Sequence, residues 1–161
     1  MDWLLAPFEY DLSTWHPLAV HLPVVLLPLG ALAAVVYAVT GGVRLRLGLL
    51  VLFAVASAAT WWAVETGQRL YDEVEGTPIV DELIAQHRTT ASWTLRLSGA
   101  VTLLLAGLTG WRTWQLRTSA GPRRLVADAR WARLIVVVLA GAAALLVVYA
   151  GHVGGVMVWG R

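Results

Sequence analysis

The chain has 161 residues, 58% of them apolar, and a formal net charge of +2 in which every basic residue is an arginine. Soluble domains are roughly 45–50% apolar, so the composition predicts a membrane protein and not a nucleic-acid-binding protein. The absence of cysteine excludes disulfides, thiolate metal sites and iron–sulfur clusters ligated by this chain.

Four stretches are long enough to cross a bilayer, which takes about 20 mostly apolar residues per helix. In chain order they cover about 17–39, 47–66, 91–111 and 134–159. The third helix is expected to begin before its apolar part, near Pro78, with Thr77 as the N-cap. Four spans leave little chain for anything else. We therefore predict an all-α integral membrane four-helix bundle that forms one domain over residues 1–161.

The charged residues outside the spans predict the orientation. The first and third connections carry arginines, at positions 44 and 46 and again from 112 to 133, whereas the second connection is acidic. By the positive-inside rule the arginine-rich connections face the cytoplasm, which places both termini on the extracytoplasmic side. The segment before the first span contains Asp2, Glu9 and Asp11 and no basic residue, so we expect a retained span and not a cleaved signal peptide.

All four histidines fall at the predicted extracytoplasmic face. His16 and His21 begin the first span, His87 precedes the third apolar stretch, and His152 lies near the outer end of the fourth. At 1.5 Å per residue, His21 lies about 7 Å deeper than His16. The depths predict a shallow pair of His16 with His87. They also predict a deep pair of His21 with His152.

Imidazoles from different helices in an apolar, sulfur-free pocket can ligate haem iron axially, two per haem. They can also bind copper, zinc or non-haem iron directly, or relay protons. We predict one or two haem b groups, with His21 and His152 as the first candidates for axial ligands. His16 and His87 are candidates for the ligands of a second haem, or for hydrogen bonds to haem propionates.

Three further residues are predicted to support the site. Gly151 and Gly155 leave room for a flat, bulky group, and their spacing also permits close helix contact. Glu65 adds a carboxylate at the outer end of the second span, where the position favours capping of the helix end over contact with a ligand.

Each histidine also has a simpler structural interpretation. His16 and His21 could serve the start of the helix, with His21 bonding a carbonyl that a nearby proline frees. His87 could be a solvated interfacial residue, and His152 a hydrogen-bonded core residue. Arg96, inside the third span, could snorkel to the outer headgroups or contact a partner. A cofactor-free structural subunit of a larger membrane complex is therefore a competing interpretation.

Several motifs resemble those of a known family. They are HPLAVHLPVVLLPLGAL near the start, ETG at 65–67, the histidine that opens the third helix, and AGHVGGVMVWG at the end. Together they resemble the bacterial membrane family catalogued as domain of unknown function 2231, over nearly the whole chain. The sequence departs from that pattern at Leu22, where the family commonly has Phe, and at Val156, where it often has Glu or Gln.

The resemblance implies an electron-transfer setting, because such domains occur fused or adjacent to cytochrome c-like and Rieske-type modules. We therefore predict an electron-transfer component of the bacterial inner membrane, not an enzyme on its own. The expected partners are the lipid bilayer, an extracytoplasmic redox protein or other subunits of a membrane complex, and a quinone. The alternative is a membrane protein that binds copper, zinc or iron through its histidines.

Overall fold

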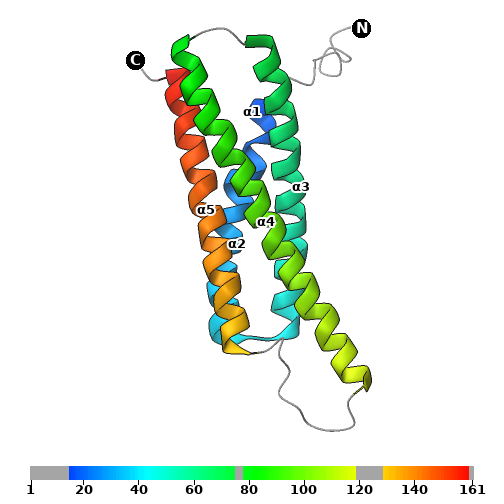
Figure 1. Cartoon of the computed structure of the whole chain (residues 1–161). Coiled ribbons are helices and arrows are strands. Elements are labelled where there is room, and N and C mark those ends of the chain that lie inside the picture. The colour runs from blue at the N-terminus through cyan, green and yellow to red at the C-terminus, as the bar shows by residue number, and fades with distance from the viewer. Residues whose placement is uncertain (1–14, 75–77, 119–128, 160–161) are drawn as a thin grey trace, which may run out of the picture.

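Antiparallel helices form an elongated bundle (Figure 1), and the computed structural model describes residues 15–74, 78–118 and 129–159. The short helix α1 (His16–Ala19) is continued by α2 (His21–Thr40) after a turn at Val20. The remaining helices are α3 (Val43–Val74), α4 (Pro78–Thr118) and α5 (Arg130–Trp159). The described residues contain no strand, so the all-α prediction is confirmed.

The apolar stretches of this bundle confirm the predicted four-helix membrane fold. The stretches long and apolar enough to cross a membrane are His16–Thr40, Val43–Asp72, Glu82–Thr118 and Arg130–Met157. The helices extend past the apolar segments that the sequence suggests: α3 continues to Val74 instead of ending near residue 66. At 1.5 Å per residue, the 41 residues of α4 measure about 62 Å, roughly twice the hydrocarbon thickness of about 30 Å. The α4 helix therefore projects from the membrane.

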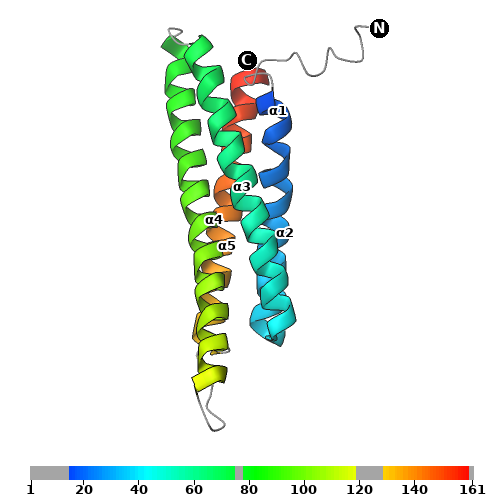
Figure 2. The same ribbon diagram turned by 90° about the vertical axis from the view of Figure 1, so that its right-hand side faces the viewer.

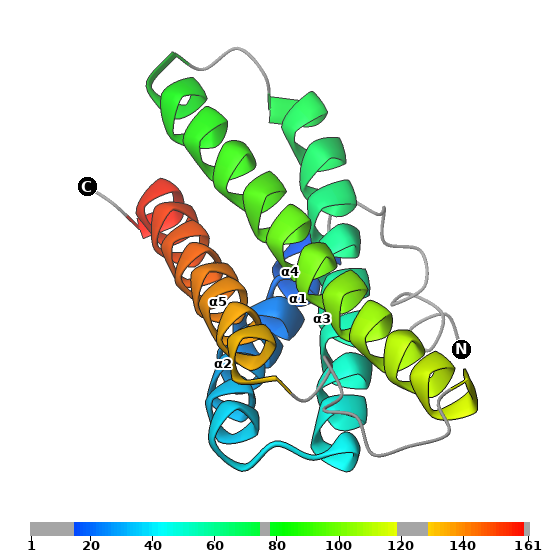
Figure 3. The same cartoon turned by 60° about the horizontal axis from the view of Figure 1, so that its bottom comes forward.

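The helices pack in a ring. Helix α2 packs on α3, α3 on α4, α4 on α5, and α5 on α2, while α1 packs on α3. This is the up-down-up-down arrangement of antiparallel neighbours. Figure 2 shows α4 reaching beyond its neighbours at the lower end, and Figure 3 shows α5 beside α2 and α4 beside α3.

The two ends of the bundle differ in chemistry. One end, here called the histidine end, carries α1 and the first turns of α4, with His16 and His87 (Figure 1). The opposite end, here called the arginine end, carries Arg46 and Arg133. The last described residues of α5 also lie at the histidine end. The first and the last described residues therefore lie at the same end of the bundle. That this end is extracytoplasmic stays a prediction, and the N-cap at Thr77 lies outside the described residues.

The apolar core fills the bundle from its middle to the arginine end. Its largest fully buried apolar side chains are Leu27, Tyr37, Leu49, Phe53, Val101, Leu105 and Val136. Gly30 of α2 lies against the ring of Phe53 on α3, and a Cβ at Gly30 would stand 2.9 Å from two ring atoms. Glycine at this position lets the aromatic ring reach the backbone of the neighbouring helix.

Hydroxyl side chains replace bulky apolar ones toward the histidine end. Buried Thr60, Thr90 and Thr94 donate hydrogen bonds to the carbonyl four residues earlier in their own helices, at 2.7, 2.8 and 2.9 Å. This back-bonding satisfies each hydroxyl without help from a neighbouring helix. Because these side chains are small, they leave space between the helices near His16 and His87.

Candidate functional site

A cavity of about 640 Å³ opens between the helices at the histidine end. All four sides of the bundle contribute to its lining, which is mostly apolar and includes the rings of His16, His21 and His87. Ligand pockets typically measure about 300–1,000 Å³ and combine apolar walls with a few polar groups. The cavity therefore falls within the size range of ligand pockets and has their mostly apolar character.

His16 opens α1, and its ring reaches across to α3. Nδ1 lies 3.0 Å from the Ala63 carbonyl oxygen and 3.2 Å from Thr66 Oγ1. The Thr66 hydroxyl donates to the Trp62 carbonyl oxygen at 3.0 Å, so its oxygen accepts from the ring. Because a carbonyl oxygen only accepts, Nδ1 of His16 carries the hydrogen. The Nε2 atom of the neutral ring therefore keeps its lone pair.

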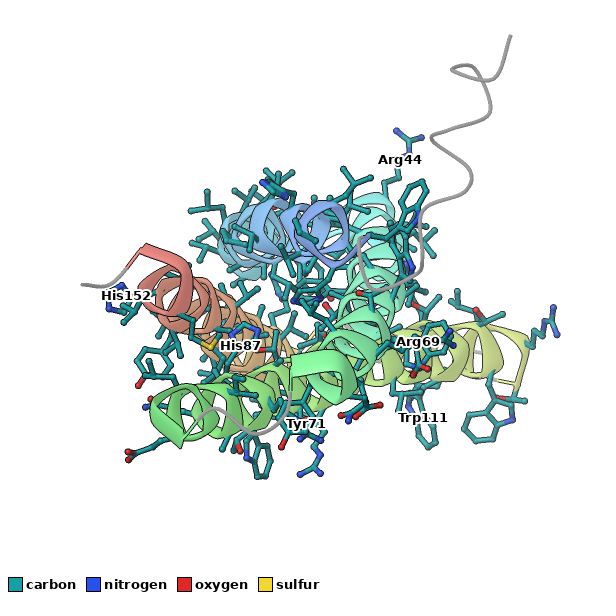
Figure 4. The ribbon with its side chains drawn as sticks, turned by 90° about the horizontal axis from the view of Figure 1, so that it is seen from above. Arg44, Arg69, Tyr71, His87, Trp111 and His152 are labelled. Atoms are coloured by element: carbon teal, nitrogen blue, oxygen red, sulfur yellow. The ribbon has the colours of Figure 1, made fainter. Side chains whose placement is uncertain are left out.

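His87 of α4 is held in the same way by the opposite half of the bundle. Its Nδ1 donates to the Ala150 carbonyl oxygen of α5 at 2.9 Å. Figure 4 shows its side chain directed into the bundle, between α4 and α5. Among the described residues, Nε2 of neither His16 nor His87 makes a hydrogen bond. Metal-ligating histidines are commonly fixed through the second ring nitrogen by such a bond to a carbonyl.

The rings of His16 and His87 face the same space. Their centroids lie 6.3 Å apart, and their planes are close to perpendicular, at 84°. Both rings are half-buried and line the cavity. The shallow pair that depth along the helices predicts is thus brought together in the structure.

Two glycines make room for these rings. A Cβ at Gly67 of α3 would stand 2.7 Å from Cε1 of His16, which is closer than real Cβ contacts allow. On α5, a Cβ at Gly154 would stand 3.4 Å from Cε1 of His87. Each imidazole therefore lies directly against the backbone of a neighbouring helix, and the contact is tighter at Gly67.

The structure does not join His21 to His152. His21 is exposed at one edge of the cavity, and its Nδ1 donates to the Pro17 carbonyl oxygen one turn earlier. His152 is exposed and lies outside the cavity lining, and Figure 4 shows it directed away from His87 and the bundle. Ligation by the deep pair stays a prediction that this geometry does not favour. Depth along a helix does not fix the direction around its axis.

The structure places the three predicted supporting residues differently with respect to the cavity. Gly151 and Gly155 line the cavity, and a Cβ on either would meet nothing within 4 Å, so space is open beside both. Glu65 is exposed, lies outside the cavity lining and pairs with Arg69 one turn later at 3.6 Å. Because α3 continues to Val74, Glu65 lies within the helix and does not cap its end, so the predicted capping role is wrong; Glu65 forms an exposed ion pair within α3 instead.

Several residues of the cavity were not singled out from the sequence. Thr66, Gly67 and Gly154 support the two rings, and Arg88 lies at the rim of the cavity. Their signals are positional: Gly67 ends the ETG motif, Gly154 follows His152 closely, and Arg88 directly follows His87. Contacts between helices, which sequence spacing cannot supply, assign their roles.

Together, the fold and the cavity define a four-helix membrane protein in which two histidine rings from different helices lie close together at one end of the bundle. The chain belongs to the family described as Predicted membrane protein (DUF2231), whose model matches residues 13–161. This match confirms the family resemblance of the sequence motifs. No curated protein and no solved structure matches the chain.

Proposed function

We propose that this chain is a b-type cytochrome-like electron-transfer subunit, with haem b held between His16 and His87. One observation carries the proposal. Two imidazoles from different helices face one cavity, and each is fixed through Nδ1–H to a backbone carbonyl so that Nε2 keeps a lone pair. This replaces the deep pair with the shallow pair as the first candidate for axial ligation.

The spacing of the two rings fits a metal ion between them. With imidazole nitrogens about 2.0–2.1 Å from a metal, two rings on opposite sides of the ion have centroids about 6 Å apart. The centroids of His16 and His87 lie 6.3 Å apart. Perpendicular ring planes are compatible with this arrangement, because each ring can rotate about its bond to the metal.

The number of ligands favours haem over a bare metal ion. Haem iron takes two axial protein ligands, whereas structural zinc sites take four. Among the residues that the structure describes, no group of three or more histidines and carboxylates could hold a metal ion. The cavity of about 640 Å³ with mostly apolar walls also suits a flat macrocycle better than a small hydrated ion.

The residues around the pair would set the properties of the bound group. Haem b supplies one-electron transfer when it is bound. The carbonyl oxygens of Ala63 and Ala150 orient the two rings and raise their basicity as ligands. The apolar walls exclude water, and low solvent exposure is one of the factors that tune haem potentials.

The position of the cavity supports a role at one face of the membrane. It lies at the histidine end, and the arginine-rich connections favour an extracytoplasmic location for this end by the positive-inside rule. We propose that the subunit exchanges electrons there with an extracytoplasmic redox protein, another membrane subunit or a quinone, in a bacterial inner membrane. Transfer across the whole bilayer would then need another subunit, because the histidines lie at one end only.

The test is an absorption spectrum of the full chain purified in mild detergent after expression with added haem precursor. We expect a Soret band and a reduced α-band that His16→Ala and His87→Ala remove. The variants His21→Ala and His152→Ala should keep both bands and serve as matched controls. A wild-type protein with no haem in the pyridine assay would refute the proposal. Copper, zinc or iron in the same colourless sample would support the bare-metal alternative.

A further inference from the structure

An arginine is held at the rim of the cavity, next to the histidine pair. Nη2 of Arg88 donates to Oε1 of Gln68 at 2.6 Å, and its guanidinium carbon lies 4.5 Å from the centroid of the Tyr71 ring. Arg88 follows His87 directly on α4, and Gln68 follows Gly67, which supports His16, on α3. Gln68 and Tyr71 of α3 thus hold the exposed guanidinium group at a cavity that both imidazoles also line, and all three rim residues line that cavity.

No carboxylate neutralises Arg88 among the described residues. The ion pair described at this end joins Arg69 to Glu65. The nearest acidic group in the Arg88 network is Asp72, which accepts from Gln68 Nε2 at 3.1 Å and reaches Arg88 only through that amide. Arginine stays charged at all relevant pH values and has five N–H donors. One bond to Gln68 leaves most of these donors for a ligand.

We propose that Arg88 binds the carboxylate of an amphipathic ligand whose apolar body occupies the cavity. Guanidinium groups bind carboxylates through charge-assisted, often bidentate hydrogen bonds. The cavity supplies apolar walls for the body of the ligand, and the rim supplies one fixed cation for its polar end. The identity of the ligand as haem b, with propionates at the rim, rests on the proposed function. A fatty acid offers the same carboxylate chemistry from the lipid phase.

The side chains of His87 and Arg88 point in different directions from α4, which agrees with separate roles for the histidine and the arginine toward one ligand. His87 bonds α5 through Ala150, whereas Arg88 turns to Gln68 and Tyr71 on α3. Successive helical residues point about 100° apart, so one ligand can contact both. Because side chains tilt toward the N-terminus of their helix, and α4 begins at the histidine end, the Arg88 side chain is expected to tilt toward that end of the bundle.

The test compares haem b with its dimethyl ester, in which both carboxylates are blocked, on the purified full chain in detergent. We expect Arg88→Gln to weaken binding of haem b about tenfold, as the loss of a charge-assisted hydrogen bond predicts. The dimethyl ester should bind wild-type protein more weakly by a similar factor and should not distinguish wild type from Arg88→Gln. Arg88→Lys should recover part of the affinity for haem b.

Arg69→Gln is the matched control. Arg69 is an exposed arginine at the same end of the bundle but lies outside the cavity lining and is paired with Glu65. Figure 4 shows it on the other side of the bundle from His87. Its variant should bind haem b like wild type. Equal loss of affinity for haem b and for the ester in Arg88→Gln would overturn the proposal, because that outcome indicates a merely structural role.

A second ligand distinguishes failure of the Arg88 proposal from failure of the haem proposal. If wild-type protein binds no haem, the same comparison is made with a pyrene-labelled fatty acid and its methyl ester. A preference for the acid that Arg88→Gln abolishes would support the carboxylate site with a lipid source. Equal binding of acid and ester by both proteins, or no binding of either, would refute it.

Discussion

The ring of His16 lies so close to the backbone of Gly67 that an added Cβ would stand 2.7 Å from Cε1. The contact joins the first residue of α1 to a residue of α3 that is 51 positions later in the chain. A side chain at position 67 would fit only if the His16 ring moved away from its place near His87. Glycine is therefore favoured here by the position of the histidine ring.

The first prediction tests this contact. Gly67→Ala should displace the His16 ring and so lower the haem-to-protein ratio severalfold, as a misplaced ligand would. Gly141→Ala is the control, because Gly141 lies outside the cavity lining and a Cβ there meets nothing within 4 Å. The pyridine assay and the Soret absorbance measure both. Full haem content in Gly67→Ala would contradict the assigned position of His16.

A second prediction concerns the hydrogen bond from His16 to Thr66. Thr66→Val removes the hydroxyl acceptor at 3.2 Å but leaves the Ala63 carbonyl at 3.0 Å. The variant should keep its haem and show a higher midpoint potential, because a less basic imidazole stabilises ferric iron less. We expect the midpoint potential to shift by less than about 60 mV, which corresponds to a tenfold change in the equilibrium constant of a one-electron couple.

The control for Thr66→Val is Thr60→Val. Thr60 is buried, lines the cavity and bonds only the Ala56 carbonyl of its own helix. Redox titration of both variants measures the difference. An equal shift in the two would assign the effect to the polarity of the cavity and not to the bond with His16.

A third prediction concerns the stability of the core. Gly30→Ala should push against the ring of Phe53 and destabilise the bundle by about 1–3 kcal/mol, as overpacking does. Phe53→Leu removes the obstructing ring atoms, so the double variant should lose less than the sum of the two single losses. Thermal unfolding in detergent measures the four proteins. Additive losses would show that Gly30 and Phe53 do not interact.

The fourth prediction concerns orientation. The natural chain has no cysteine, so a single introduced thiol reports its own location. Asp72→Cys at the histidine end and Arg117→Cys near the end of α4 both replace exposed residues. A membrane-impermeant maleimide applied to intact spheroplasts should label the first and not the second. The reverse pattern would place the histidine end in the cytoplasm and refute the proposed extracytoplasmic partner.

The spans could be predicted because hydropathy and length suffice for membrane helices. The start of α4 at Pro78 agrees with its prediction from the sequence. The end of α3 could not be predicted, since α3 continues beyond its apolar stretch to Val74, into residues whose helical state is decided by packing. Depth along the helices also predicted that His16 and His87 share one level. It could not predict that His21 turns to its own Pro17 carbonyl or that His152 points outward. Those directions depend on the turn at Val20 and on the rotation of α5 within the bundle.

The contacts that support the rings were harder still to predict. Gly67 and Gly154 are two of 15 glycines in the chain, and their places in the ETG motif and close to His152 do not show which histidine ring each one contacts. Their role follows from the approach of another helix. In the same way, Arg88 gains significance only because Gln68 and Tyr71 of α3 hold it at the rim.

The hydrogen bonds that hold the two histidine rings lie in different halves of the bundle. His16 is bonded to α3, within the first pair of spans, and His87 to α5, within the second pair. A group ligated by both rings would therefore lock the two hairpins together, and a chain lacking it would be the looser form.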